Sequence, residues 1–170
     1  MIIETEQLII IPLTQEQFKL LLGSMEKMEE ALQLMPSGAI MDSHLQWVMK
    51  YQFEKGMNDT DNWIWHTNRQ IILKSENKSV GSINFKNTPE ENAMVEIGYG
   101  THNGFRNKGY MTEAVRALSE WALKQPSVKS IIAETEKSNL ASQRVLQKTG
   151  MTKYQESDMA YWWKLDRANF

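Results

Sequence analysis

A turn rich in glycine and basic residues is the first candidate for a binding site. Residues 102–110 read His-Asn-Gly-Phe-Arg-Asn-Lys-Gly-Tyr and join an expected strand to an expected helix. A helix N-terminus offers unpaired N–H groups and a partial positive charge to an anion. Gly104 and Gly109 allow close backbone approach or positive φ, and Arg106 and Lys108 add charge. The turn is therefore suited to a diphosphate, and a solvated loop with ordinary cap glycines explains its spacing equally well.

Glutamates on expected strands are candidates for a general base. Because side chains alternate along a strand, Glu96 shares a face with Gly98 and Gly100. The two glycines leave room beside the carboxylate for a ligand, and a cross-strand salt bridge on a solvated face is the alternative. Glu134 and Glu136 are further candidates by the same reasoning.

A second helix supplies a hydroxyl that could act as an acid. Asn139 is expected to cap a helix that ends at Lys148, with Gly150 as its left-handed terminator. Ser142 lies in the first turn of this helix, and its hydroxyl has one proton to donate. Spacing alone is explained as well by an ordinary first-turn serine. Tyr154, just after the helix, is a weaker candidate for the acid.

The histidines and the C-terminal tryptophans give weaker indications. His44, His66 and His102 have no mutual spacing that suits a shared metal ion. His102 adjoins the glycine-rich turn and could contact a bound ligand, although most such histidines are simply solvated. Trp162 and Trp163 face opposite sides of an expected strand, so one ring is expected in the core. The other could line a binding site or a dimer interface.

The elements that must position these residues follow the order β-α-α-β-β-β-α-β-α-β-β. Turn residues at 77–78 and 89–92 make the three middle strands an antiparallel meander. Gly56 is expected to end the second helix. Residues 24–43 show less pattern, with helix-compatible sequence up to Met35 and a turn at residues 36–38. The expected strands cover 8–11, 63–73, 79–85, 94–101, 128–135, 151–156 and 160–165, and the expected helices start near residues 14, 43, 111 and 139.

The composition is that of one ordinary globular domain over residues 1–170. The chain contains no cysteine, which excludes disulfides, thiolate metal sites and cysteine nucleophiles. A net charge of −2 gives no bulk attraction to nucleic acid or to an anionic membrane. The acidic first residues and the absence of a long apolar run indicate a cytoplasmic protein without a signal peptide or membrane span.

The motifs, taken in order, resemble the GNAT superfamily of N-acetyltransferases, and within it the RimJ/RimL type of ribosomal-protein N-terminal acetyltransferase. Three positions depart from the pattern. The family usually or often has Arg at Gln7 and Ile11, and many members have Gly or Ala at Met111. The resemblance is carried by Thr5–Ile9, Glu96-Ile97-Gly98-Tyr99, the Arg106-x-x-Gly109 turn, Ala133-Glu134-Thr135 and Asn139–Met151.

The resemblance implies a mixed α/β fold with a central, mostly antiparallel sheet of about seven strands and about four helices. The central strands are expected to splay apart, with acetyl-CoA in the gap and pantetheine along the strand that ends near Thr101. The implied activity is acetyl transfer to a primary amine, on a protein N-terminus or a small molecule, by direct attack in a ternary complex. A non-catalytic acyl-CoA-binding module and an antibiotic amine acetyltransferase are the alternatives. Residues 24–64 would set the acceptor, and the chain would be a monomer or a homodimer.

The resemblance also implies a role for each candidate residue. Glu96 would be the base, and Ser142 would protonate or stabilise the leaving thiolate. Asn139 would hold the pantetheine as well as cap its helix. A backbone N–H near Tyr99, Gly100 or Thr101 would bind the oxyanion of the tetrahedral intermediate. The diphosphate of the cofactor would be bound by backbone N–H groups of the glycine-rich turn and the start of its helix. These are the N–H groups of Arg106, Asn107, Lys108, Gly109, Tyr110 and Met111.

Overall fold

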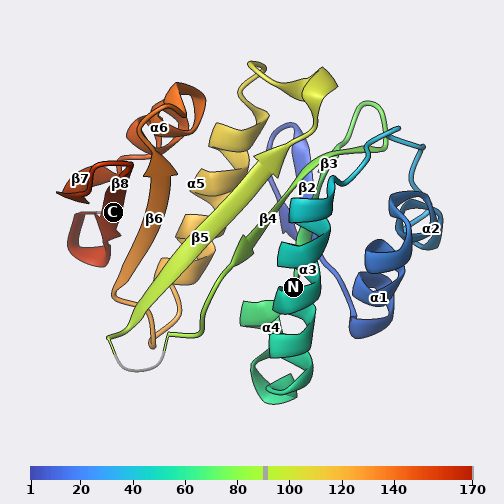
Figure 1. Cartoon of the computed structure of the whole chain (residues 1–170), viewed down its shortest axis with the longest axis horizontal. Coiled ribbons are helices and arrows are strands. Elements are labelled where there is room, and N and C mark those ends of the chain that lie inside the picture. The colour runs from blue at the N-terminus through green and yellow to red at the C-terminus, as the bar shows by residue number, and fades with distance from the viewer. Residues whose placement is uncertain (90–91, 170) are drawn as a thin grey trace.

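A single eight-stranded sheet with helices on both faces forms the framework of the computed structural model, which describes residues 1–89 and 92–169 (Figure 1). The strands are β1 (Ile3–Glu4), β2 (Leu8–Pro12), β3 (Arg69–Leu73), β4 (Lys78–Phe85), β5 (Met94–Thr101), β6 (Ser130–Glu136), β7 (Thr152–Glu156) and β8 (Ala160–Asp166). The helices are α1 (Gln15–Gly23), α2 (Met25–Ala31), α3 (Ser43–Met57), α4 (Trp63–His66), α5 (Tyr110–Leu123) and α6 (Leu140–Lys148), with 3-10 turns at Thr60–Asn62, Asn103–Phe105 and Arg167–Asn169.

The sheet opens in its middle. Its strand order is β1-β2-β3-β4-β5-β6-β8-β7, and every pairing is antiparallel except that of β5 with β6. These two parallel strands pair only from Met94 to Glu96 and from Ser130 to Ile132. Beyond those residues β5 stays paired with β4, while β6 stays paired with β8. The expected mixed fold and the gap between its central strands are therefore both present (Figure 1).

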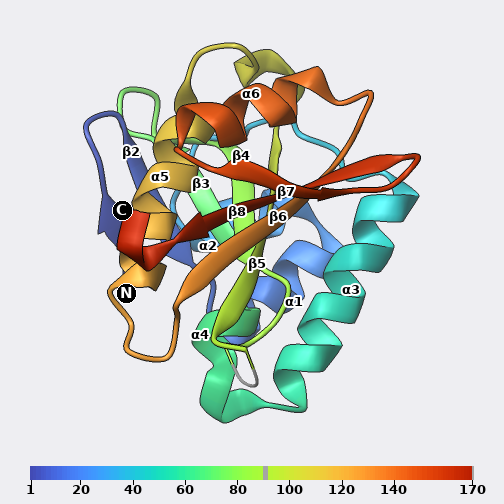
Figure 2. The same ribbon diagram turned by 90° about the vertical axis from the view of Figure 1, so that its left-hand side faces the viewer.

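Local sequence explains where the helices begin. Thr14 and Gln17 form the expected capping box at the start of α1. In α5 the buried residues recur at helical spacing and pack on the main core of the sheet. A second, smaller core joins α1, α2 and α3, so that α3 and α5 lie on opposite sides of the sheet (Figure 2). No helix in the described part of the chain is long and apolar enough to span a membrane.

The predicted strand at 63–73 was wrong in its first residues, because Trp63 to His66 form α4 and β3 begins only at Arg69. The indole N–H of Trp63 donates to the Leu13 carbonyl at 2.9 Å, and Trp65 is buried in the main core. Tertiary packing thus overrides the strand propensity of this aromatic run.

Gly56 does not end α3 as predicted, because the helix continues to Met57. A Cβ at Gly56 would lie 2.8 Å from the Trp63 ring and 2.9 Å from the Cβ of His66. The glycine therefore permits close packing of α4 on α3. The helix α2 lies within the stretch expected to be helix-compatible, although no separate helix was predicted there, and the short β1 was not predicted. The predicted turn at 89–92 has residues 90–91 outside the described structure.

Candidate functional site

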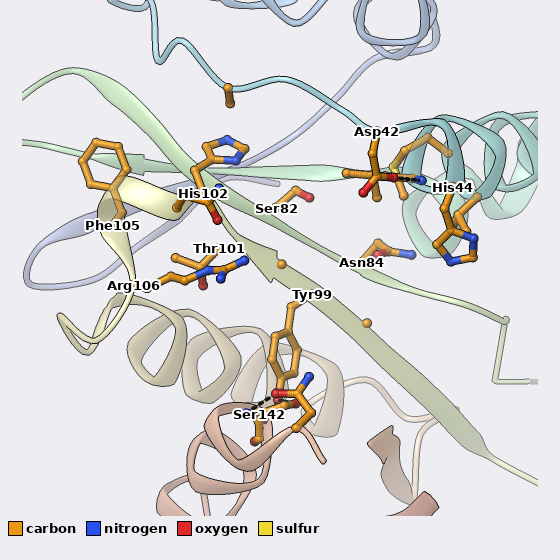
Figure 3. Close-up of a pocket in the computed structure, with 18 of the residues that line it drawn as sticks. Asp42, His44, Ser82, Asn84, Tyr99, Thr101, His102, Phe105, Arg106 and Ser142 are labelled. Atoms are coloured by element: carbon orange, nitrogen blue, oxygen red, sulfur yellow. Dashed lines mark hydrogen bonds between the residues drawn. The ribbon is translucent and has the colours of Figure 1, made fainter. Parts of the chain in front are cut away.

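A cleft of about 1120 Å³ lies where β5 and β6 diverge (Figure 3). Its lining includes residues 97–106 at the end of β5, residues 134–136 at the end of β6, and Asn139 and Ser142 at the start of α6. The opposite wall comes from α3 and the loop before it, and part of the floor from Ser82 and Asn84 of β4. One cavity therefore joins the glycine-rich turn to the poorly patterned segment that precedes and includes α3.

The turn that leads into α5 has the backbone geometry of an anion site. Gly109 is the N-cap residue with φ 86° and ψ −12°, and Asn107 also has a positive φ of 61°. No side chain in the described part of the chain caps the helix, and its first intrahelical bond runs from the Glu113 N–H to the Gly109 carbonyl. The N–H groups before Glu113 therefore stay available to a ligand. Arg106 lines the cleft beside them (Figure 3).

Met111 departs from the family pattern without blocking this turn. Its side chain is buried in the main core, among residues of α5 and the sheet. Only the backbone N–H of Met111 is therefore available to a ligand at the helix N-terminus.

Two neighbouring residues of the turn also contact the protein. Tyr110 is partly buried against the same core, and the Lys108 ammonium lies 5.4 Å from the centre of the Phe105 ring.

The candidate carboxylates occupy different environments. Glu96 lies next to the cleft and not among its lining residues, and its Oε1 is 2.5 Å from the Lys86 Nζ. This is the salt bridge that the sequence allowed as the alternative to a base. Glu134 and Glu136 are exposed at the end of β6, and both line the cleft. The role of Glu96 as base thus stays a prediction, and Glu134 and Glu136 are the two candidate carboxylates that line the cleft.

Two hydroxyl groups meet across the gap in the sheet. Asn139 caps α6 as predicted, since its Oδ1 accepts a hydrogen bond from the Ser142 N–H at 3.1 Å. The Ser142 Oγ lies 2.8 Å from the Tyr99 hydroxyl (Figure 3). Burial raises the pKa of Tyr99 to about 12, although the hydrogen bond with Ser142 acts in the opposite direction. The sequence predicts a role only for the backbone of Tyr99, because no local pattern links its hydroxyl to that of a residue so far along the chain.

The wall of the cleft that α3 and its preceding loop form is held by contacts between segments distant in the sequence, which no local pattern predicts. Both carboxylate oxygens of Glu29, a buried residue of α2, accept a hydrogen bond from the Ser37 N–H at 3.2 Å. This contact ties down the loop of residues 37–40, which lines the cleft. Gln52 of α3 donates to the carbonyls of His66 and Phe85, each at 2.9 Å, and so fixes α3 over the sheet.

The remaining predicted residues are dispersed. His44 and His102 line the cleft, and burial lowers the pKa of His102. His66 lies away from the cleft, with its Nε2 2.8 Å from the Oδ2 of Asp59.

Trp163 is the expected core ring, and its indole N–H donates to Thr135 at 2.9 Å. Its neighbour Trp162 is half-buried outside the cleft lining, and Tyr154 is exposed on β7. No group of three or more potential metal ligands occurs among the described residues.

Comparison with known proteins identifies the family. A model of the acetyltransferase (GNAT) domain matches residues 7–152. The chain belongs to this family. YjdG of Bacillus subtilis strain 168, an uncharacterized N-acetyltransferase, is 36% identical over 108 residues, which cover 63% of this chain and 61% of that protein. YnaD of the same strain is 36% identical over 81 residues, 48% of this chain and 47% of that one. The matches thus span less than two thirds of these relatives.

Solved structures show the same GNAT fold over nearly the whole chain. A GNAT acetyltransferase from Bacillus anthracis has a TM-score of 0.66 at 22% identity, with 99% of each chain covered. RimL, a ribosomal L7/L12 α-N-protein acetyltransferase in complex with coenzyme A, has a TM-score of 0.71 at 15% identity, with 100% of each covered. A ribosomal-protein-S5-alanine acetyltransferase from Vibrio fischeri scores 0.72 at 16% identity, over 98% of this chain and 97% of that one. The predicted superfamily and fold are confirmed.

Proposed function

We propose that this GNAT domain transfers an acetyl group from acetyl-CoA to a primary amine. The observation that carries the proposal is the shared cleft, which has a helix N-terminus without a side-chain cap near one end and two exposed carboxylates, Glu134 and Glu136, across the gap in the sheet. The curated relatives are named N-acetyltransferases, and the RimL structure contains coenzyme A. The names of these relatives and the coenzyme A in the RimL structure support the same donor and reaction for this chain.

The donor side fits acetyl-CoA in two ways. The free N–H groups at the start of α5, together with Arg106 and Lys108, suit the diphosphate. Beyond Glu96 the edge of β5 that faces β6 pairs with no strand among residues 1–89 and 92–169, so backbone groups from Tyr99 to Thr101 are open to a ligand. Pantetheine amides could pair there as a substitute strand. When bound, acetyl-CoA supplies the activated acyl group as a thioester.

For the base we favour Glu134 over Glu96. Continuing the parallel register of Met94 with Ser130 sets Glu134 opposite Gly98 and Glu136 opposite Gly100. A carboxylate facing a glycine across the gap has room for an amine between them. Glu134 is nearer to the point where the strands part, whereas Glu96 is ion-paired with Lys86. Glu134 would take a proton from the acceptor ammonium so that the free amine attacks the thioester, and the Ser142 hydroxyl would face the leaving sulfur.

The acceptor is proposed to be an amine on a protein N-terminus or on a small molecule. An α-amino group has a pKa of about 7.7–8.0, against about 10.4 for lysine, so it needs a weaker base. The fold shared with RimL and the S5-alanine acetyltransferase supports the RimJ/RimL type and thus a protein N-terminus. Competition between peptides with free and blocked N-termini would distinguish this acceptor from a small molecule.

The first experiment is a thermal shift with acetyl-CoA, followed by measurement of free-thiol release over a panel of amines and peptides. We expect acetyl-CoA to raise the melting temperature and at least one acceptor to release thiol. If no shift occurs, the donor assignment is wrong. Binding without turnover over the whole panel would favour the non-catalytic acyl-CoA-binding module instead.

The second experiment compares the pH–rate profiles of Glu134→Gln, Glu136→Gln and Glu96→Gln. We expect Glu134→Gln to lower the rate by about 10²–10⁴-fold, most strongly at low pH where the amine is protonated. Glu96→Gln is the matched control, since it makes the same change one strand away. A profile altered only by Glu96→Gln would restore Glu96 as the base.

A further inference from the structure

The Tyr99 side chain crosses the gap between the two halves of the sheet. Tyr99 pairs with Ile83 of β4, whereas Ser142 belongs to α6, which follows β6. The 2.8 Å contact between their hydroxyls therefore lies beyond the last paired residues of β5 and β6 (Figure 3). Both residues line the cleft. The contact therefore links β5 to α6 across the gap, at the place where the acyl group would be transferred.

The hydrogen-bond direction decides what Ser142 can do. A serine hydroxyl has one proton, so a serine that donates to Tyr99 has none left for a ligand. The Tyr99 hydroxyl proton has two acceptors within reach, the Ser142 Oγ at 2.8 Å and the Ser142 carbonyl oxygen at 3.3 Å, and the Oγ is the nearer. A phenol is also a stronger acid than an alcohol and so the better donor of the two hydroxyl groups. The Tyr99 ring is held against the main core, and the Ser142 N–H is held by Asn139. Only rotation of the serine hydroxymethyl group remains, and the phenol restrains it.

We propose that Tyr99 is a positioning residue that acts through Ser142, because its hydroxyl donates to the serine Oγ and leaves the serine proton directed into the cleft. The inference rests on the proposed acetyl transfer. That reaction forms a C–N bond and breaks a C–S bond, whose electron pair stays on the sulfur. The serine O–H donates a hydrogen bond to that charge, and Tyr99 gives up no proton. Burial, which raises the Tyr99 pKa to about 12, keeps the phenol protonated at neutral pH.

A double-mutant cycle tests this dependence. Tyr99→Phe removes only the hydroxyl, and we expect it to lower kcat about tenfold, as the loss of one hydrogen bond would. Acetyl-CoA affinity should change by less than about twofold, since the phenol holds no part of the donor. In a Ser142→Ala background Tyr99→Phe should have no further effect, whereas in Ser142→Thr, which keeps a hydroxyl, it should still lower kcat. An equal loss in the Ala background would overturn the proposal.

Crystal structures provide a readout that does not need turnover. With coenzyme A bound, the wild-type Ser142 Oγ should lie beside the sulfur, with the Tyr99 hydroxyl on its other side. In Tyr99→Phe the serine should adopt more than one rotamer while the ring stays in place. A sulfur next to Tyr99 and remote from Ser142 would overturn the inference while leaving acetyl transfer intact. Failure to bind acetyl-CoA at all would instead remove the proposed function and this inference together.

Discussion

The glycine-rich turn of residues 102–110 offers a sharp test, because its two glycines differ in their backbone φ angle. Gly109 has φ 86°, whereas Gly104 has no positive φ, and a Cβ at either position would have nothing within 4 Å. Alanine in the left-handed region costs about 1–2 kcal/mol. Stiffening of the unfolded chain returns about 0.4–1 kcal/mol. Gly109→Ala should therefore lose about 1 kcal/mol of unfolding free energy, and Gly104→Ala should lose none.

Urea unfolding and thermal melts of the two variants without ligand measure this difference. For a chain of this size about 1 kcal/mol corresponds to roughly 2–4 °C in melting temperature. The same strain should weaken acetyl-CoA binding, because a turn that relaxes to negative φ no longer aims its N–H groups together. Acetyl-CoA should then raise the Tm of Gly109→Ala less than that of the wild type. Equal stability of the two variants would refute the assignment of strain to this one torsion angle.

Three further changes test the framework around the site. Gly81→Ala would place a Cβ against the Gly100 carbonyl oxygen, so urea unfolding should show a loss of about 1–3 kcal/mol in stability. Gly100→Ala is the control and should cause no such loss, because a Cβ there would have no atom within 4 Å. Burial raises the pKa of Glu113, but hydrogen bonds from Thr5 and Gln7 outweigh it and lower the pKa overall. Glu113→Gln should therefore be less stable than wild type at neutral pH, and the gap should close as pH falls through the lowered pKa; a constant gap would contradict this. The buried Ser119 hydroxyl has no hydrogen-bond partner among the described residues, so Ser119→Ala should raise stability by about 1 kcal/mol, and a lower Tm would argue for a missed partner.

Several helix starts, including those at the candidate site, could be predicted from the sequence because their signals are local. A helix start depends on residues within one turn of each other, so the Asn139 cap and the Thr14 capping box could be recognised from residue type and spacing. The same holds for Gly109 and Gly150, whose positive φ values follow from their places at helix ends. The ordered motifs then identified the family.

Tertiary structure decided the features that join distant segments. Alternation along β5 put Glu96 on the face of the two glycines, but only the folded chain shows that Lys86 neutralises it and that Glu134 borders the cleft. The Tyr99–Ser142 contact depends on how far β5 and β6 diverge, which no local pattern encodes. Local propensity acts within a few residues, whereas catalytic geometry is set by packing between segments far apart in the chain. The sequence alone therefore determined the glycine-rich turn and the helix start that follows it, and the fold decided which side chains face them across the gap.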